Sequence, residues 1–276
     1  MLKKIAIQGF EGCFHQIAAE HYFSKDITID PCVSFTKVVQ HVASQEADMG
    51  LMAIENSIAG TILQNYDLLQ RSDLYVVGEV YLPIKQHLIM MPGQSEKDIT
   101  EVRSHPMALY QCRGYLEKFP DWEIVESADT ALSVKHLSER KSPNVAVIAS
   151  DRAAEIYGME IVKREINTDK TNYTRFLVLS REEKQRDTIH DHKASLYFRT
   201  ADDPGSLAKV LACFGEFGIN LSKLQSYPIP GMQWRYYFHA DLDFNDMNQF
   251  DEAIACISPI TKQLRILGIY TPGQIV

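Results

Sequence analysis

Apolar residues recur along the first two-thirds of the chain in two alternating patterns. Short buried runs predict strands, and spacings of three and four residues predict helices. The predicted strands cover residues 5–7, 49–54, 75–91 with an interruption at Pro83, 123–125 and 145–148. The predicted helices cover residues 38–43, a segment from about 61 to 70, 106–119, 130–137 and 151–157, the last capped by Asp151. This order predicts an α/β fold with one or two largely parallel sheets.

The pattern changes after residue 180 and then starts again. Residues 181–193 are dense in charge and poor in apolar groups, which predicts a solvated linker. The domain that follows, 194–276, has predicted strands at 194–199, 220–229, 232–244 and 264–270, with helices ending at Gly218 and covering 247–257. This βαββαβ order is typical of a ferredoxin-like α+β sandwich, whose open edges can pair with another copy.

Composition and charge narrow the function classes. The chain has 276 residues, of which 45% are hydrophobic and 23% charged, and its formal net charge is −8. These values are typical of a soluble globular protein with two domains. No basic stripe is present, so nucleic acid is not an expected partner. No apolar stretch is long enough for a membrane span or a signal peptide, so we expect a cytoplasmic protein.

The five cysteines argue against a cross-linked or metal-bound scaffold. They lie far apart and form no C-x-x-C pair, at Cys13, Cys32, Cys112, Cys213 and Cys256. We therefore expect free buried thiols in a reducing compartment, and neither a disulfide framework nor a zinc site. His190 and His192 lie in the charged segment without a third ligand nearby, so we expect no metal there.

Residues 172–176 place a hydroxyl, a guanidinium and an aromatic ring at the start of an apolar strand. Arg175 offers a rigid fork of donors that suits a carboxylate, and Thr174 offers a hydroxyl donor. Taken alone, the pair is more typical of a solvated strand end than of a ligand site. The other motifs of the chain change that interpretation.

Several segments together are similar to one family. They are residues 54–60, 78–79 with 82–84, 104–106 with 108–109 and 111–112, 127–131, and 172–176. On these motifs, the chain resembles prephenate dehydratase with a C-terminal ACT regulatory domain. The resemblance covers residues 1–180 and implies two lobes like those of periplasmic binding proteins, with the substrate between them. Lobe one would comprise about 1–78 and 161–180, and lobe two about 79–160.

The resemblance implies conversion of prephenate to phenylpyruvate, water and carbon dioxide, with no metal or organic cofactor. It assigns Thr174 to the departing hydroxyl, while Arg175 suits the carboxylate that is retained. A threonine hydroxyl is a weak acid, so we expect it to donate a hydrogen bond rather than transfer its proton fully. The other substrate-binding candidates are Phe176, Asn56, Ser57, Ser104, His105, Gln111, Ser127 and Thr130.

Some of these candidates have structural alternatives. Asn56 and Ser57 are also typical helix caps, and His105 could hold a backbone carbonyl instead of acting as an acid. Ser127 and Thr130 lie at a strand-to-helix turn, where free backbone amides make a ready anion site. Gln111 could face the cleft or pack in the interior.

The chain departs from the family near its start. The common Gly-Pro-Glu-Gly-Thr-Phe-Ser loop reads Gly-Phe-Glu-Gly-Cys-Phe-His over residues 9–15. We expect the loop geometry to persist through Gly9 and Gly12, while the hydroxyl contacts of the family loop are in doubt. Cys13 is expected to be a small buried filler.

The C-terminal half resembles an amino-acid-binding ACT domain at residues 203–211 and 218–221. The family's Glu-Ser-Arg-Pro motif reads Gln-Ser-Tyr-Pro here, which could weaken the site or shift its ligand. The resemblance implies L-phenylalanine as effector, bound between subunits of a homodimer or homotetramer. The alternative is that Pro204 and Gly205 only begin a helix. The effector-binding candidates are Asp203, Pro204, Gly205, Ser206, Leu207, Ala208, Asn220, Gln225 and Ser226.

Two other functions stay open at this point. Arogenate dehydratase differs only in a substrate that carries an amino group in place of the side-chain carbonyl. A non-catalytic amino-acid sensor could share the same architecture, although the retained Thr174, Arg175 and Phe176 argue against it.

Overall fold

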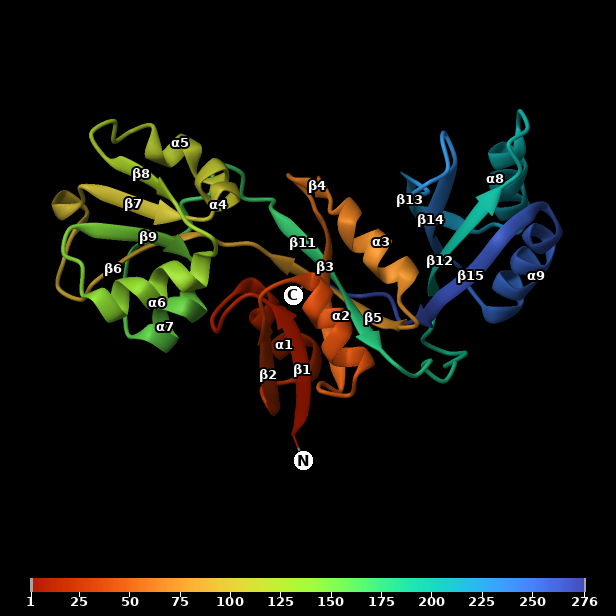
Figure 1. The fold of residues 1–276 in the computed structure, drawn as a ribbon, viewed down its shortest axis with the longest axis horizontal. Helices are drawn as coiled ribbons and strands as arrows, with labels where there is room; N and C mark the ends of the chain where they lie inside the picture. The colour runs from red at the N-terminus through yellow and green to blue at the C-terminus, as the bar shows by residue number, and fades with distance from the viewer. Residues whose placement is uncertain (1, 276) are drawn as a thin grey trace. The chain divides into compact units, whose positions relative to one another are not determined.

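The computed structural model describes residues 2–275, which divide into two compact units (Figure 1). Within that range, the first unit comprises residues 2–62, 80–176 and 275, and the second comprises 63–79 and 177–274. Among the residues described, no helix is long and apolar enough to cross a membrane.

The first sheet has the strand order β2-β1-β3-β11-β5, with the short β4 beside β3. β1 pairs in parallel with both β2 and β3. The strands are β1 (Lys3–Gln8), β2 (Ile27–Cys32), β3 (Met49–Asn56), β4 (Gly60–Thr61), β5 (Tyr75–Pro83) and β11 (Tyr173–Ser180). The neighbouring helices are α1 (Phe14–Phe23), α2 (Phe35–Ala43) and α3 (Leu63–Arg71). The sequence pattern predicts neither α1 nor β2. The strand β2 is missed because it is a half-exposed edge strand without a buried run.

The second sheet has the order β10-β6-β9-β7-β8 and is mixed. β7 runs parallel to β8 and β9, whereas β6 runs antiparallel to β9 and β10, so the prediction of largely parallel sheets is wrong here. The strands are β6 (His87–Met90), β7 (Glu101–Ser104), β8 (Glu123–Glu126), β9 (Val145–Ala149) and β10 (Glu160–Lys163). The helical segments are η1 (Glu96–Asp98), α4 (Pro106–Gln111), α5 (Arg113–Leu116), α6 (Thr130–Arg140) and α7 (Asp151–Tyr157).

Two details of this region correct the sequence predictions. The helix expected over 106–119 is split into α4 and α5, because Cys112 leaves the helical conformation with φ −104° and ψ 9°. The cap of α7 is Ser150 rather than Asp151, since the Ser150 side chain accepts the backbone N–H of Ala153.

The chain crosses twice between the first and second sheets. β5 stays in the first sheet through Pro83, and β10 stays in the second through Lys163, so the crossings cover residues 84–86 and 164–172. They lie a few residues beyond the positions that the resemblance implies. The Asn167 side chain joins the two crossings, because it accepts from the N–H of Gln86 at 2.7 Å and donates to the carbonyl of Ile84 at 2.8 Å.

The third sheet has the order β13-β14-β12-β15, and all neighbours are antiparallel. Its strands are β12 (Lys193–Thr200), β13 (Asn220–Pro228), β14 (Tyr236–Asp243) and β15 (Thr261–Tyr270). The helices α8 (Ser206–Glu216) and α9 (Met247–Ile257) lie beside this sheet (Figure 1) and share one apolar core with it, and the short η2 (Ser258–Ile260) follows α9. The predicted βαββαβ order is confirmed.

The segment before β12 is not simply solvated. Asp191 is fully buried and accepts hydrogen bonds from the Asp187 N–H at 2.8 Å, from Thr271 at 3.0 Å and from Lys184. This network anchors residues that the charge pattern assigns to a linker.

The prediction that all five thiols are free is also wrong. Cys213 on α8 and Cys256 on α9 form a disulfide with a Cα–Cα distance of 6.2 Å, while Cys13, Cys32 and Cys112 are free. The two helices pack side by side, which brings together cysteines that are 43 residues apart in sequence.

A buried ion pair lies inside the second unit. Lys193 Nζ is 2.9 Å from Glu79 Oε1, and the side chains are 6% and 0% exposed. Glu79 also accepts the N–H of Gly273 at 3.0 Å. Removing one member of such a pair leaves the other charge buried, which is strongly destabilising.

We expect Lys193→Met to lower the free energy of unfolding by about 3–5 kcal/mol. Adding Glu79→Gln should recover part of the loss, because the amide can still accept from Gly273. Urea unfolding, followed by circular dichroism, measures both. Lys209→Met, at an exposed position of α8, is the control. Equal stability of the Lys193 variant and the unchanged chain would contradict this assignment.

Candidate active site

The side-chain amide of Asn56 joins the end of β3 to the start of β11. Its Nδ2 lies 3.0 Å from Thr174 Oγ1, 2.7 Å from Asn172 Oδ1 and 3.1 Å from the Tyr173 carbonyl oxygen. Its Oδ1 accepts the backbone N–H groups of residues 58 and 59 at 3.0 and 2.8 Å. One amide therefore shapes the turn after β3 and holds the Thr174 hydroxyl.

This contact orients the hydroxyl of Thr174. The residue is 8% exposed, and Asn56 donates to its oxygen, which occupies an acceptor position of that oxygen. The hydroxyl proton is thereby directed away from the amide. The Thr174 hydroxyl can therefore donate to a further group.

Ser57 completes the same turn. Its hydroxyl donates to the Thr171 carbonyl at 3.1 Å and accepts the Tyr173 N–H at 2.9 Å, and its own N–H donates to the Tyr173 carbonyl at 2.8 Å. Ser57 thus ties the second crossing to β3. Neither Asn56 nor Ser57 caps a helix, because a turn and β4 follow them.

Thr174 and Arg175 are adjacent in the chain but lie on opposite faces of β11, since strand side chains alternate. Arg175 is 5% exposed, and its guanidinium carbon is 5.9 Å from the ring centre of Tyr81. Phe176 shares a face with Thr174, is 1% exposed, and packs edge-on against His15 at 4.9 Å. Phe176 is therefore a packing residue beside the site.

Sequence reasoning did not select His15 as a functional residue. Burial lowers the pKa of its imidazole to about 3, so the ring is neutral near pH 7. Among residues 2–275, its Nε2 has no hydrogen-bond partner. The only sequence signal is that histidine stands where the family loop has serine.

The loop at residues 9–13 keeps the backbone that the resemblance implies. Gly9 and Gly12 have φ of +109° and +87°, which side chains disfavour. A Cβ on Gly12 would lie 2.6 Å from the Ala153 Cα, and the Gly12 carbonyl accepts the Ser150 hydroxyl at 2.5 Å. Burial raises the pKa of the Cys13 thiol to about 12, so this group is not a thiolate near neutral pH.

The N-terminus of α6, where an anion site was expected, is capped by the chain itself. Asp129 Oδ1 accepts the Leu132 N–H at 2.8 Å. Burial raises the pKa of the Asp129 carboxyl. Ser127 faces the Ser133 hydroxyl at 2.5 Å, and Thr130 is the first residue of the helix. A Cβ on Gly9 would lie 3.3 Å from Asp129 Oδ2, so this carboxyl faces the glycine loop.

Ser104 and His105 are engaged within the second sheet and α4. Ser104 is fully buried and donates to the Ile148 carbonyl at 2.6 Å. His105 is exposed, and its Nδ1 accepts the Met107 N–H at 3.2 Å as the cap of α4. His105 thus holds a backbone group, as its structural alternative expects, but the group is an N–H and not a carbonyl.

A pocket of about 280 Å³ lies beside the Asn56 turn. Ile58 lines it from that turn, Thr168 and Asp169 from the second crossing, and Gln111 from the end of α4. Gln111 also accepts from Gln86 at 3.3 Å. The structure thus brings Asn56, Ser57 and Thr174 into one network and places Gln111 at the adjacent pocket.

The effector candidates lie in the ferredoxin-like part of the second unit, which comprises β12 to β15 with α8 and α9. Gly205, with φ +82°, starts α8, and the Asp203 carbonyl accepts the Ser206 N–H at 3.1 Å. The other first-turn candidates, Pro204, Leu207 and Ala208, flank this start. On β13, Asn220 donates to Asp243 at 3.1 Å, and Gln225 donates to the Ser226 carbonyl at 2.7 Å.

The buried Thr174 hydroxyl is joined through Asn56 to the turn whose Ile58 lines a pocket. A pocket with a few placed polar groups nearby is typical of an enzyme for a small molecule. The family model described as prephenate dehydratase matches residues 5–184. Arogenate dehydratase/prephenate dehydratase 1, chloroplastic, of Arabidopsis thaliana is 35% identical over 97% of this chain and 71% of that protein. The chain belongs to the prephenate dehydratase family, which places it among the carbon–oxygen lyases.

Solved structures agree with this fold. Prephenate dehydratase from Arthrobacter aurescens, in complex with L-Phe, matches with a TM-score of 0.87 and 27% identity over 97% of this chain and 90% of that one. A structure described as GqqA, a novel type of quorum quenching acylase, matches with a TM-score of 0.90 and 28% identity over 98% of both chains.

The Asn56 amide gives a specific test. Asn56→Asp keeps an oxygen for the N–H groups of residues 58 and 59 but removes the donor to Thr174. We expect a folded protein whose kcat for prephenate falls about 100-fold, because the hydroxyl loses its orientation. Formation of phenylpyruvate measures it, with exposed Asn245→Asp as control. Unchanged kcat would remove Asn56 from the site.

Proposed function

We propose that this protein converts prephenate to phenylpyruvate, water and carbon dioxide in L-phenylalanine biosynthesis, with Thr174 at the departing hydroxyl. The family membership supports the reaction, and the Asn56–Thr174 contact is the observation that carries the assignment of Thr174. No metal or organic cofactor is part of the proposal.

The reaction breaks two bonds of the substrate ring. The bond to the ring carboxylate breaks, its electron pair moves through the diene, and the hydroxyl leaves from the opposite ring carbon. The departing hydroxide needs one proton to become water, and this proton comes in the end from solvent. Aromatisation provides the driving force. The enzyme therefore needs to position the ring and stabilise charge on the departing oxygen.

Thr174 suits the second task. Its hydroxyl is buried and is held by a donor, so it can donate to the departing oxygen without prior reorganisation. Its neighbours Ser57 and His15 are not assigned to proton transfer: the Ser57 hydroxyl is engaged by backbone groups, and the low pKa of His15 leaves its ring neutral.

Arg175 remains our candidate for the retained carboxylate. Its guanidinium is buried and permanently charged. Because Arg175 lies on the face of β11 opposite Thr174, one ligand contacts both side chains only if it extends around the start of the strand at Tyr173. We assign Asn56 and Ser57 to holding the turn beside Thr174, and Gln111 to the lining of the pocket. His105, Ser127 and Thr130 stay candidates on lobe two, and Phe176 and Ser104 are assigned to packing.

Three related functions are arogenate dehydration, acyl transfer by an acylase and amino-acid sensing without catalysis. Arogenate is a close alternative substrate, and the Arabidopsis relative is named for both activities. An acylase needs an activated nucleophile. Burial raises the pKa of Cys13 to about 12, and Ser57 is held by backbone groups, so neither supports an acylase here. A sensor without catalysis would not need the oriented hydroxyl of Thr174.

We expect Thr174→Val, which keeps the shape and removes the hydroxyl, to lower kcat by about 10²–10³-fold with little change in KM. Thr174→Ser keeps the hydroxyl and should retain most activity. Ultraviolet detection of phenylpyruvate, run beside an arogenate assay, measures both variants and the substrate preference. A valine variant with near-normal turnover would defeat the assignment.

The regulatory part of the proposal concerns the ferredoxin-like unit. We assign it as an ACT domain that binds L-phenylalanine near Gly205 and Asn220. The supporting observations are its βαββαβ order and the similarity over 97% of this chain to a prephenate dehydratase in complex with L-Phe. The open edges of β13 and β15 suit a homodimer or homotetramer. A cytoplasmic location is part of the proposal: the three free buried cysteines support it, whereas the Cys213–Cys256 disulfide is a bond that reducing compartments rarely keep.

Regulation requires that the effector bind the two catalytic states with different affinity. Calorimetry of L-phenylalanine with the full chain, with and without a substrate analogue, should therefore give two different Kd values. D-phenylalanine serves as the control ligand. Identical Kd values in the two titrations would refute coupling, and no binding at all would refute the effector site.

A further inference from the structure

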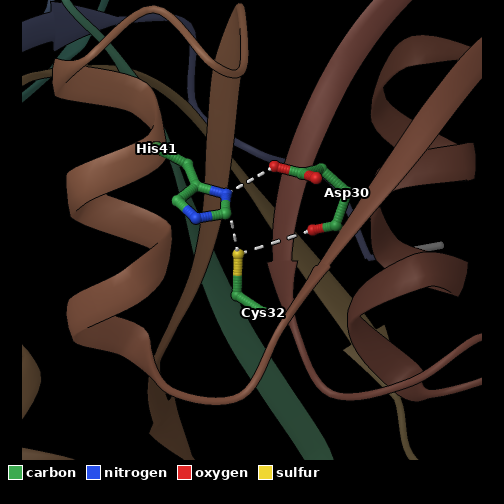
Figure 2. Close-up of side chains that lie close together, drawn as sticks. All are labelled: Asp30, Cys32 and His41. Atoms are coloured by element: carbon green, nitrogen blue, oxygen red, sulfur yellow. Dashed lines mark hydrogen bonds and ion pairs between the residues drawn. The ribbon is translucent and has the colours of Figure 1, made fainter.

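We propose that Asp30, Cys32 and His41 form a binding site for one zinc ion, at the edge of the first sheet and apart from the dehydratase site (Figure 2). Asp30 and Cys32 are two residues apart on β2, so their side chains lie on the same face of the strand. His41 comes from α2. The three ligand atoms all lie within 4.8 Å of one another.

The arrangement differs from that of a nucleophile with its base. His41 Nδ1 is 2.7 Å from Asp30 Oδ2 and 3.6 Å from Cys32 Sγ, so the same ring nitrogen faces both groups. In a catalytic relay, the thiol and the carboxylate contact opposite nitrogens of the ring. Figure 2 shows the three side chains pointing toward one another, as ligands of a shared ion do.

The distances are close to those of tetrahedral zinc. Zn–N bonds of about 2.0–2.1 Å and a Zn–S bond of about 2.3 Å separate nitrogen and sulfur by about 3.5 Å. The structure has 3.6 Å. The corresponding N–O separation is about 3.3 Å, so Asp30 Oδ2 has to withdraw slightly when the ion replaces its hydrogen bond to His41.

The outer atoms of the ligands already have partners. His41 Nε2 faces Glu46 Oε2 at 3.7 Å, and Asp30 Oδ1 faces Lys4 Nζ at 3.2 Å. A carboxylate behind the second ring nitrogen is the usual support for a metal-bound histidine. At 3.7 Å, the Glu46 contact is an ion-pair distance and not a hydrogen bond. Nδ1 donates to the Asp30 carboxylate in the metal-free chain, so its proton has to leave Nδ1 when the ion binds.

Binding also changes the charge of the site. The Cys32 S–H bond is replaced by a bond from sulfur to zinc, and the proton leaves to solvent. The thiolate and Asp30 then carry two negative charges at the ion, and Glu46, Lys4 and Lys37 are the charged groups around them.

The ligand types select the class of metal. Thiolate and imidazole with one carboxylate suit zinc, whereas magnesium and calcium require oxygen ligands. The side chains of Asp30 and His41 are 16% and 25% exposed, so solvent can reach the site and supply a fourth ligand. β1 and β3 separate β2 from β11 in the first sheet, and the Cys32 carbonyl accepts the N–H of Gly9 in the glycine loop at 2.9 Å.

The experiment uses the full chain, stripped of metal and kept reduced. Zinc is titrated against a chromophoric chelator, and cobalt is used as a spectroscopic substitute. We expect one ion per chain and a thiolate-to-cobalt absorption band. Zinc should also raise the Tm, because it binds the folded chain preferentially. Magnesium should do neither.

Variants separate this site from others. Cys32→Ser should remove the cobalt band, and Asp30→Asn and His41→Gln should each weaken zinc binding strongly. Glu46→Gln should weaken it by about 10–100-fold, as an outer partner does. The controls are Cys112→Ala, at another free cysteine, and His190→Gln, in the charged segment before β12. Prephenate turnover of the metal-free variants reports that each is folded.

Three results would overturn the proposal. They are absence of one-to-one zinc binding, zinc binding that Cys32→Ser, Asp30→Asn and His41→Gln leave unchanged, and loss of binding in a control variant. If one ligand variant does not fold, the other two decide the matter.

Discussion

The amide of Asn56 is the contact on which the site depends. Its oxygen accepts the backbone N–H groups of the turn after β3, and its nitrogen donates to the Thr174 hydroxyl. Because the two residues are 118 positions apart, this bond also fixes where the returning chain enters the first sheet. Asn167 has a similar role, because its side chain ties the second crossing to residues 84 and 86 of the first. Buried amides suit such junctions, since each offers both donors and an acceptor.

Burial keeps two titratable groups of the N-terminal segment neutral near pH 7. The imidazole of His15 has a lowered pKa, and the thiol of Cys13 has a raised one. Such surroundings suit a reaction that aromatisation drives, because the enzyme then gains most from donors held where charge develops. The buried carboxyl of Asp129, which faces the glycine loop, is the exception in lobe two.

The sequence predicted much of the fold, and its failures have physical causes. α9 coincides with its prediction because its apolar residues follow a clean helical spacing. β2 was missed because an edge strand with half-exposed positions lacks a buried run. Asp191 was assigned to a solvated linker because charge density does not reveal the partners that bury a carboxylate. The Cys213–Cys256 bond was missed because pairing over 43 residues depends on helix packing.

By itself, the sequence determined the βαββαβ order of the C-terminal domain and the family to which the chain belongs, because local apolar spacing and ordered motifs are readable along one dimension. It also singled out Thr174. Only the tertiary structure decided that Thr174 and Arg175 lie on opposite faces of one strand and that Asn56 holds the hydroxyl. It alone brought Cys32 and Asp30 to His41. Side-chain direction and distant contacts arise from strand pleating and packing, which adjacency in sequence does not encode.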